Sequence, residues 1–491
     1  MSPTETPLPQ KQRINCSKKL LNCLLKVSEK RAQPLYAVGG TVRDLLLNKS
    51  SQDLDLAVPG SARNWAEQLC SEIGAGTLID LSGPEDEAVR VVWQKEQVDI
   101  SSFRGNATSI EEDLQLRDFT INAVGVELQE LSAQARFTFI DPTGGIGDLK
   151  QKIVRHLAGA FIADPVRMLR GYRLNAQLAF SMLEETRNEV RCHKALIKNV
   201  AVERVAHELE LIFESDCTSI TMEQMDKDGL LKYLLPELCQ GQGVEQPEFH
   251  HLDVLDHCFL ALKMMEEIIA SPALFFPLQQ EVIAEYLNDR RVRRCLKWAA
   301  LMHDVGKPGT RETKDDGSGR VTFYRHDEVG RTLFEAYAER SHWSRLDSDR
   351  VAGLIGMHMH PFHLCNVQRE AGITKRAALK ISNRAGKDLI GLFLLAMSDS
   401  LASSGVKKPE KMEEELVELF TVVEKIFLEN IQPVLQGPKL INGKDLIEHF
   451  ELEPGPTFSI ILQELEVARV EGDVETRADA LSWVEKFLEK E

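Results

Sequence analysis

The sequence predicts an α+β protein, in which an N-terminal α/β head with a small β-sheet precedes regions that are all helical. Short β-like runs alternate with helical stretches through the head, as is typical of a mixed unit. The runs are residues 35–38, 54–58, 89–93, 98–101 and 137–140. From about residue 155 onward, apolar residues recur every three or four positions, which is the period of an amphipathic helix.

The chain of 491 residues is long enough for about three domains of roughly 150 residues each. Changes in pattern divide it further. We expect an N-terminal extension at 1–30, the head at 31–155 and a helical neck at 156–245. A stretch rich in Gly, Gln and Pro then indicates a linker. A His-rich helical domain at 246–404 and a helical tail at 405–491 complete the chain.

Composition excludes several classes of protein. A content of 43% hydrophobic and 27% charged residues is ordinary for a globular protein, and excludes a largely disordered chain. No apolar run is long enough to cross a membrane, so no membrane partner is expected. Nine scattered cysteines without a C-x-x-C pair favour a reducing cytoplasm over a disulfide framework. The net charge of −17 argues against general polyanion binding, so an RNA partner needs local basic clusters.

The first candidate site begins where a β run ends in Gly39-Gly40 and a helix carrying Arg43 starts. Two glycines let the backbone pass close to a ligand, and N–H groups at a helix start suit phosphate. Arg43 would add a charge-assisted contact. A plain tight turn is the alternative interpretation.

Three carboxylates follow on β-like runs. Asp53 and Asp55 are two apart, so in a strand they face the same side, and Asp99 lies on a later alternating run. Such carboxylates suit Mg²⁺, which also binds substrate phosphates. This set fits a two-metal nucleotidyl transfer, in which the metals serve the attacking hydroxyl and the leaving pyrophosphate. The alternative is a solvated turn with scattered acids.

The ordered motifs of the first 240 residues resemble the class II tRNA nucleotidyltransferases and bacterial poly(A) polymerases. They are Gly-Gly-x-Val-Arg-Asp from residue 39, Asp-x-Asp from 53, Arg-Asp-Phe-Thr-Ile-Asn-Ala from 117, Asp-Pro-x-Gly-Gly-x-x-Asp-Leu from 141 and Asp-Pro-x-Arg-x-Leu-Arg from 164. Segments 440–446 and 454–456 look like the C-terminal part of bacterial CCA-type enzymes, which favours tRNA over poly(A) synthesis.

The resemblance implies a role for each motif residue. By this resemblance, the catalytic metals would bind to Asp53 and Asp55, with Asp99 in support. The triphosphate would be held by Gly39, Gly40 and Arg43, and the ribose and triphosphate would be placed by Arg117, Asp118 and Asn122. The base would be recognised by Asp164 and Arg167, and Arg170 would complete the nucleotide-binding set. The implied cofactor is Mg²⁺, and the implied partners are tRNA with CTP, ATP or both.

The base-reading role also has a physical rationale. Asp164 and Arg167 are three residues apart on an expected helix and therefore share a face. Cytosine and adenine both present an amine beside a ring-nitrogen acceptor, which a carboxylate and a guanidinium complement. Guanine and uracil have the opposite polarity. A local salt bridge is the alternative.

Three departures from the family pattern bear on specificity. Ala163 stands where a Glu usually orients the neighbouring Arg, and Leu116 replaces a usual Arg. Only six residues, 105–110, separate Phe103-Arg104 from Glu111-Glu112, whereas full CCA-adding members carry a longer loop there. The short connector resembles the CC-adding subgroup, which leaves the terminal A to a separate enzyme. Poly(A) polymerases shorten this loop as well.

The helical region 246–404 carries a second set of candidate ligands. In chain order they are His257, His303, Asp304, His326, His358 and Asp399. Imidazoles and carboxylates suit a divalent metal such as Mg²⁺, Mn²⁺ or Ni²⁺. Their order resembles the HD-domain phosphohydrolases, and the resemblance implies cleavage of phosphoesters. The alternative is a retained fold that only packs against tRNA. His250, His251, His360 and His363 receive no assignment.

Basic clusters are the candidates for RNA contact. Arg187, Arg191, Lys194 and Lys198 follow the base-reading helix, and we expect them to meet tRNA, while residues 290–294 form the densest cluster. Solvated helix faces are the alternative. Two other functions stay open: a poly(A) polymerase, and an HD phosphohydrolase whose head only binds RNA.

Overall fold

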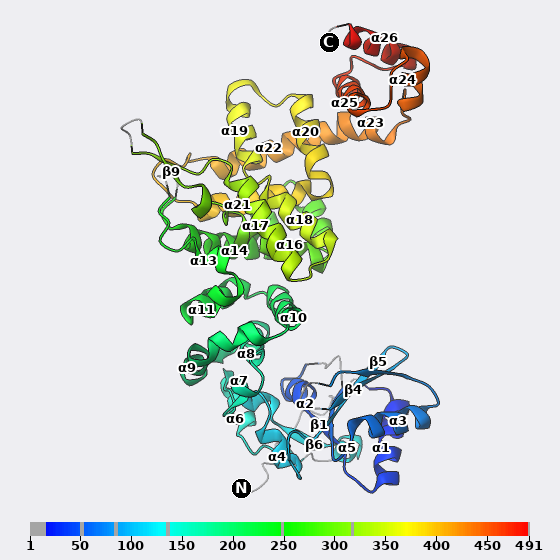
Figure 1. The fold of residues 1–491 in the computed structure, drawn as a ribbon, viewed down its shortest axis with the longest axis vertical. Coiled ribbons are helices and arrows are strands. Elements are labelled where there is room, and N and C mark those ends of the chain that lie inside the picture. The colour runs from blue at the N-terminus through cyan, green and yellow to red at the C-terminus, as the bar shows by residue number, and fades with distance from the viewer. Residues whose placement is uncertain are drawn as a thin grey trace. The chain divides into compact units, whose positions relative to one another are not determined.

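The computed structural model describes residues 16–49, 54–82, 87–133, 138–246, 250–315 and 319–489. It separates into two compact units (Figure 1). Unit 1 comprises Met1–Cys217 and Gln224–Tyr233, and unit 2 comprises Thr218–Glu223 and Leu234–Glu491. The expected fold class is confirmed, because a sheet-containing head is followed by helices. The finer five-part division stays a prediction.

A six-stranded sheet forms the head in unit 1, with strand order β3-β4-β5-β2-β1-β6. The strands are β1 (Tyr36–Val38), β2 (Leu54–Val58), β3 (Thr77–Asp80), β4 (Ala88–Trp93), β5 (Glu96–Ser102) and β6 (Gly125–Glu127). β2 and β5 run parallel and the other pairs antiparallel. Four of the five expected runs are strands. In the fifth, only an isolated bridge from Ile140 to Gly125 forms, and Phe137 lies outside the described residues.

The core of the head follows from alternation along the central strands. Leu54, Leu56 and Val58 are buried on β2, and they pack with residues of α1 (Lys18–Arg31) and α3 (Ala62–Ile73). Ser17 and Ser61 cap these helices by accepting from their first turns. The apolar side of the sheet is thereby covered, and strand alternation directs the intervening, half-buried Asp55 to the opposite side.

Helices continue unit 1 beyond the sheet. They are α2 (Gly39–Leu46), α4 (Ile110–Gln115), α5 (Leu128–Ala133), α6 (Gly145–Gln151), α7 (Ala160–Ala163), α8 (Arg167–Leu178), α9 (Glu184–His193) and α10 (Val202–Phe213), with β7 (Ile153–Val154) paired to β8 (Ser181–Met182). The Gly-Gly motif at 144–145 is a packing device, because a Cβ on Gly145 would lie 2.0 Å from the carbonyl oxygen of Thr120. Asp148 also accepts from the Thr120 hydroxyl at 2.6 Å, so this motif fixes the 117–123 segment.

Unit 2 is helical around a central bundle in Figure 1. The bundle contains α14 (Val254–Ala270), α16 (Arg290–Met302), α17 (His326–Arg340), α18 (Arg345–Ile355) and α21 (Leu389–Ala402). α21 is buried over nearly all its length, as its continuous apolar sequence requires. A hairpin of β9 (Glu312–Thr313) and β10 (Val321–Thr322) precedes α17. In the tail, α22 (Met412–Ile426) packs against α21, and the last helices, from α24 (Gly443–Phe450) to α26 (Arg477–Leu488), have their own small core.

Two expectations from composition can be compared with the structure. Among the described residues, no helix has both the length and the apolar character needed to cross a bilayer. All nine cysteines are described and none of them forms a disulfide.

Candidate active site and candidate metal centre

The turn from β1 to α2 forms the floor of the first site. Gly39 has a φ of +63°, which a residue with a side chain rarely adopts. A Cβ there would lie 3.3 Å from both the Asp55 Oδ2 and the Arg117 Nη1, and one on Gly40 would lie 3.1 Å from Asp55. The structure therefore brings Gly39, Gly40, Asp55 and Arg117 together. It leaves little room for a side chain at position 39 or 40.

Two of the three predicted carboxylates are neighbours across the sheet. Asp55 on β2 and Asp99 on β5 are directly paired in the parallel register, so their side chains project on the same side. Burial raises the pKa of Asp55 to about 6, and the charge of Asp99 adds to the shift, while Arg117 and Arg43 oppose it. Paired carboxylates that are costly to ionise suit a cation, so Asp55 and Asp99 fit Mg²⁺. Asp53 lies outside the described residues.

Arg90 is a site residue that the sequence did not reveal. It lies opposite Asp99 in the antiparallel β4–β5 pair and donates from Nε and Nη2 to both oxygens of Asp99 at 2.7 Å. Its neighbours Val89 and Val91 are buried, so this alternation on β4 was the one available signal. In the absence of a metal, Arg90 thus balances the charge of the third carboxylate.

We expect the affinity of this site for Mg²⁺ to fall in acid. A proton on Asp55 competes with the metal, and with a pKa of about 6 the apparent dissociation constant rises about tenfold between pH 7.5 and pH 5. Without metal the pH dependence of folding has the opposite sign: because the pKa of Asp55 is raised in the folded state, its contribution to stability is present below pH 3.8 and is lost as the pH rises toward about 6. Mn²⁺ binding followed by electron paramagnetic resonance measures the first effect, and a pH-independent affinity would contradict it.

The predicted nucleotide-binding residues form one hydrogen-bonded chain. The Arg43 Nη1 donates to the Asn122 Oδ1 at 3.0 Å, and the Asn122 Nδ2 donates to the Asp118 Oδ1 at 3.2 Å. The Arg170 Nη1 donates to the other oxygen of Asp118 at 3.0 Å. Although burial opposes it, Arg170 and Arg167 hold the pKa of Asp118 well below its usual range. An ionised, buried Asp118 therefore fixes the arginines around it.

The predicted base-reading residues lie close together but do not share a helix face, because Asp164 is extended and only Arg167 begins α8; Asp164 also has an additional partner. The Asp164 Oδ2 lies 4.0 Å from the Arg167 Nε and 2.7 Å from the Arg204 Nη2 of α10. In the family pattern a Glu at position 163 orients the guanidinium of the arginine. Here residue 163 is Ala, and Arg204 instead holds the carboxylate of Asp164. On the same helix, Glu208 lies 3.5 Å from Arg170 and 3.3 Å from Arg173.

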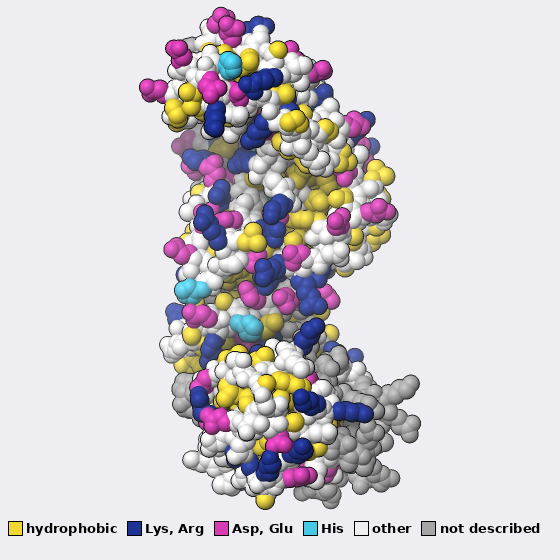
Figure 2. Space-filling view, turned by 90° about the vertical axis from the view of Figure 1, so that its right-hand side faces the viewer, with side chains coloured by type: hydrophobic (Ala, Val, Ile, Leu, Met, Phe, Trp, Pro, Cys, Tyr) yellow, Lys and Arg dark blue, Asp and Glu magenta, His cyan; other side chains and the backbone are white. Residues whose placement is uncertain are grey.

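In the basic cluster of the neck, the side chains of Arg187 and Arg191 form hydrogen bonds with a buried carboxylate. The side chain of Asp228 is fully buried, and it accepts from Arg187 and Arg191 at 2.8–3.0 Å and from the Tyr172 hydroxyl at 2.7 Å. Lys194 donates to the Asp228 carbonyl. The view in Figure 2 shows Lys and Arg interspersed with Asp and Glu rather than gathered in one patch. Contact between this cluster and RNA stays a prediction.

The second site lies within unit 2, where all six predicted ligands converge. Two groups have ligand atoms within 4.8 Å of one another, namely His257 with His303 and Asp399, and Asp304 with His326 and His358. Asp304 lies between the groups, because its oxygens are 3.2–3.7 Å from the Nε2 atoms of all four histidines. The site is buried, since five of the six residues are no more than 6% exposed.

The orientation of the four imidazoles fits metal binding. Every Nδ1 lies 2.7–3.4 Å from a backbone carbonyl oxygen, of Ala402, Ala300, Phe323 and Ile355 for His257, His303, His326 and His358 respectively. A proton on Nδ1 fits each of these contacts, and in the neutral imidazole this leaves a lone pair on Nε2 for a metal. These lone pairs face one another in two couples, His257–His303 at 3.2 Å and His326–His358 at 3.1 Å. Two facing lone pairs are unfavourable unless a cation lies beside them.

Local sequence explains how the second site is assembled. α16 ends at Met302, and His303, Asp304 and Gly306 follow directly after it. A Cβ on Gly306 would lie 2.1 Å from the carbonyl oxygen of His326, so only glycine lets the start of α17 approach Asp304. Lys307 was not predicted, and its Nζ lies 2.5 Å from the Asp304 Oδ2. His250 also lies here, with its ring packed on His257 at 4.6 Å between centroids.

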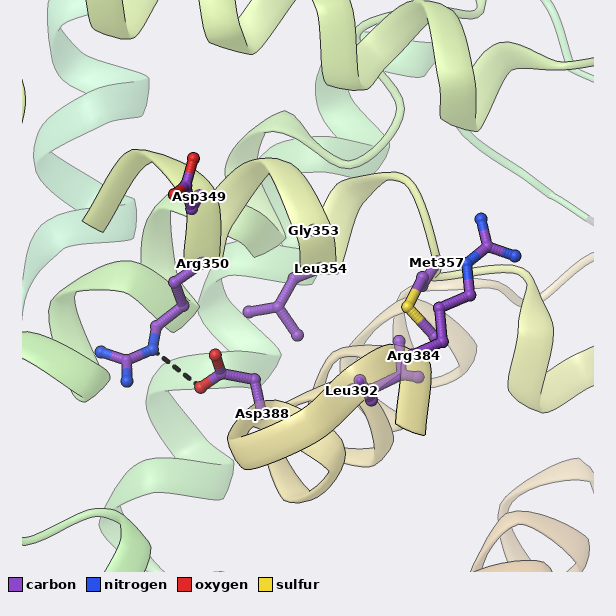
Figure 3. A pocket seen from close by; sticks show the side chains of 9 residues that line it. Asp349, Arg350, Gly353, Leu354, Met357, Arg384, Asp388 and Leu392 are labelled. Atoms are coloured by element: carbon purple, nitrogen blue, oxygen red, sulfur yellow. Dashed lines mark hydrogen bonds and ion pairs between the residues drawn. The ribbon is translucent and has the colours of Figure 1, made fainter. Parts of the chain in front are cut away.

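A separate pocket of about 360 Å³ lies between α18, α20 (Lys375–Ala385) and α21 (Figure 3). Its two arginines already have partners: Arg350 donates to Asp388 at 2.7 Å, and Arg384 donates to His360 at 2.6 Å. None of the six metal-centre residues lines it. We assign no chemistry to this pocket.

Sequence profiles of four known families match the chain in order. They are the poly A polymerase head domain at 35–155, the RNA- and SrmB-binding region of polymerase A at 179–241, the HD domain at 254–384 and domain 2 of tRNA nucleotidyltransferases at 431–484. The first contains the carboxylate site, and the third contains five of the six residues of the metal centre.

Two curated relatives match nearly the whole chain. The A-adding tRNA nucleotidyltransferase of Deinococcus radiodurans is 30% identical over 92% of this chain and 95% of its own length. The CC-adding enzyme of Thermus thermophilus is 29% identical over 91% and 92%. Among solved structures, the Thermotoga maritima CCA-adding enzyme complexed with tRNA has the same fold, with a TM-score of 0.61 at 20% identity over 96% of both chains. The chain therefore belongs to the tRNA nucleotidyltransferase family.

Proposed function

We propose that this enzyme adds C, A or both to the 3′ end of tRNA without a nucleic-acid template. The observation that carries the proposal is the pairing of Asp55 with Asp99 beside the Gly39–Gly40 turn, in one unit with the Asp164–Arg167 pair. The first arrangement suits metal-assisted phosphoryl chemistry, and the second suits selection of C and A. Full-length relatives with A-adding and CC-adding activity support the same reading.

In the proposed reaction, the tRNA 3′ hydroxyl attacks the α-phosphate of CTP or ATP, and pyrophosphate leaves. Mg²⁺ held by Asp55 and Asp99, with Asp53 as the resemblance implies, would supply stabilisation of the negative charge that develops. The N–H groups at the start of α2 and the guanidinium of Arg43 hold the triphosphate. The buried Asp118 keeps Arg170 and Asn122 in fixed positions, so that the nucleotide meets a preorganised site.

Selection between bases follows from the polarity of one side-chain pair. Asp164 accepts from the exocyclic amine of cytosine or adenine, and Arg167 donates to the ring nitrogen beside it. Uracil and guanine would place an acceptor against the carboxylate. Burial is the main cause that lowers the pKa of Arg167, yet the charge of Asp118 nearby opposes it and keeps the donor ionised.

We expect Arg204 to sharpen this selection. Its ion pair holds the Asp164 carboxylate in one orientation, so Arg204→Ala should reduce the preference for CTP and ATP over UTP and GTP about tenfold. The rates at which UTP and GTP are incorporated into a tRNA primer, relative to CTP and ATP, measure this preference. Arg63→Ala is the matched control, because that arginine makes a 2.8 Å pair with Asp80 at 52% exposure, close to the 50% of Arg204. An unchanged preference in Arg204→Ala would remove Arg204 from base selection.

The connector between β5 and α4 supports a restricted product. It is short, and among full-length relatives both an A-adding and a CC-adding enzyme occur. We propose that this chain adds one part of the CCA end, with a second enzyme completing it. The sequence resemblance favours the CC part.

We also propose a phosphohydrolase activity for the second site. The observation behind it is the convergence of four Nε2 lone pairs and two buried carboxylates, which fits two divalent cations. Lys307 beside Asp304 would add a positive charge for a phosphate group. Phosphomonoesters and phosphodiesters of nucleotides are the substrates to test.

The RNA substrate distinguishes the proposal from poly(A) synthesis. Purified protein with Mg²⁺ and all four nucleoside triphosphates should extend tRNA that lacks its CCA end by one to three nucleotides. It should leave an unstructured RNA of equal length unextended. Long A tails on either RNA would instead make the enzyme a poly(A) polymerase.

A further inference from the structure

The connector 103–109 is fastened to the head at both ends. The N–H of Phe103 donates to the carbonyl of Val58 at 3.0 Å. The N–H of Thr108 donates to Glu112 at 2.7 Å, just before α4 starts. These bonds fix both ends of the segment, and its cationic residue, Arg104, is partly buried against Asp113.

Asp113 of α4 joins this connector to the nucleotide site. Its side chain is fully buried, and its two oxygens serve two different arginines. Oδ1 accepts from the backbone N–H of Arg104 at 2.9 Å and from the Arg104 Nη1 at 3.0 Å. Oδ2 accepts from Nε and Nη2 of Arg117 at 3.1 and 2.9 Å. Although burial opposes it, Arg117 and Arg104 lower the pKa of Asp113, so the carboxylate is ionised.

This bonding leaves one end of Arg117 for a ligand. With Nε and Nη2 engaged by Asp113, Nη1 points to the phosphate turn, 3.3 Å from the position of a Cβ on Gly39. Among the described residues, Nη1 of Arg117 has no hydrogen-bond partner. The Asp55 Oδ2 is equally close to that position, so Arg117 lies beside the predicted metal ligand.

Arg104 also lies close to the base-reading arginine. Burial is the first cause that lowers the pKa of Arg117 and of Arg167, and the like charge of Arg104 contributes to both shifts. The charge of one side chain of the short connector therefore acts on two groups that the nucleotide would meet.

We propose that Arg104 is a positioning residue for the incoming nucleoside triphosphate, acting through Asp113 on Arg117. The inference rests on the proposed function and deepens it. The side chain of Arg104 adds a charged hydrogen bond to the Asp113 oxygen that already accepts from the Arg104 backbone N–H, and this second bond keeps the carboxylate, and with it Arg117, in one orientation. The connector is thereby tied to the nucleotide pocket, and the pocket keeps one shape through successive additions.

The test separates positioning from folding. Arg104→Ala should raise the KM for CTP or ATP about tenfold while kcat changes less than about threefold, because Arg117 is then free to turn away before binding. Arg104→Lys should recover most of the affinity, since an ammonium group still reaches Asp113. Arg350→Ala is the matched control: that arginine pairs with Asp388 at 2.7 Å in unit 2 and belongs to neither proposed site, so its loss should leave the KM unchanged.

Asp113→Asn tests the same Arg104–Asp113–Arg117 contacts by changing the carboxylate instead of the arginine. An amide has one acceptor oxygen and cannot serve both arginines, so the KM should rise as in Arg104→Ala. A KM within twofold of wild type in Arg104→Ala would overturn the inference, as would a loss confined to kcat and to thermal stability. Wild-type protein that transfers no nucleotide would instead refute the proposed function itself, whatever the variants do.

Discussion

Asp55→Asn is expected to lower the kcat of nucleotide transfer by about 10³-fold or more. The amide has the shape of the carboxylate but no charge, and Asp55 lies between the phosphate turn and Asp99, where a metal would be held. Single-turnover extension of a tRNA primer under saturating Mg²⁺ measures it. Asp80→Asn, an exposed carboxylate on β3, is the matched control and should keep wild-type activity.

The same Asp55→Asn protein should retain hydrolysis of phosphoesters. Its altered residue belongs to unit 1, whereas the histidine centre is built entirely within unit 2. Loss of both activities in a folded variant would contradict two separate sites, and undiminished transfer would remove Asp55 from the metal site.

Asp304→Asn should produce the reciprocal result. Because Asp304 lies near all four histidines, its neutralisation should weaken both metal groups at once. We expect metal content to fall from two ions per chain to fewer than one, and phosphohydrolase activity to fall about 10³-fold, with transfer unchanged. Elemental analysis after dialysis against divalent metal measures the content.

Two comparisons make the Asp304 result specific. Asp349→Asn removes an exposed carboxylate of α18 and should leave the metal content intact. Asp399→Asn changes one group of ligands, so it should release about one ion rather than both. Full metal occupancy in Asp304→Asn would show that the histidines alone hold the ions.

Alternation of apolar side chains predicted the central strands of the head well. β2, β4 and β5 have buried residues at every second position, so their pattern is strong. β3 has no fully buried residue, and β6 is three residues long, so neither produces such a pattern. Both strands form because they pair with neighbouring strands through their backbones. The periodicity of their own side chains does not indicate this pairing.

The candidate sites were predictable where a motif is contiguous and unpredictable where a partner is distant. Gly39, Arg117 and His303 each belong to a short, specific motif. Arg90 and Arg204 are single arginines whose roles depend on strand register or on a helix forty residues away. The basic cluster at 187–198, which is expected to contact RNA, has internal partners that its sequence does not indicate. The positive residues along this helix do not indicate that two of them, Arg187 and Arg191, donate hydrogen bonds to the buried Asp228.

The most direct measurement of the central claim sizes products on a ladder of tRNA primers. Transcripts ending at the discriminator base, at C and at CC would each receive Mg²⁺ with CTP, ATP or both, with products resolved to one nucleotide. The account predicts C or A addition that stops within the CCA sequence, and it expects arrest after two cytidines. Incorporation of U or G at comparable rates, or extension that never stops, would contradict it.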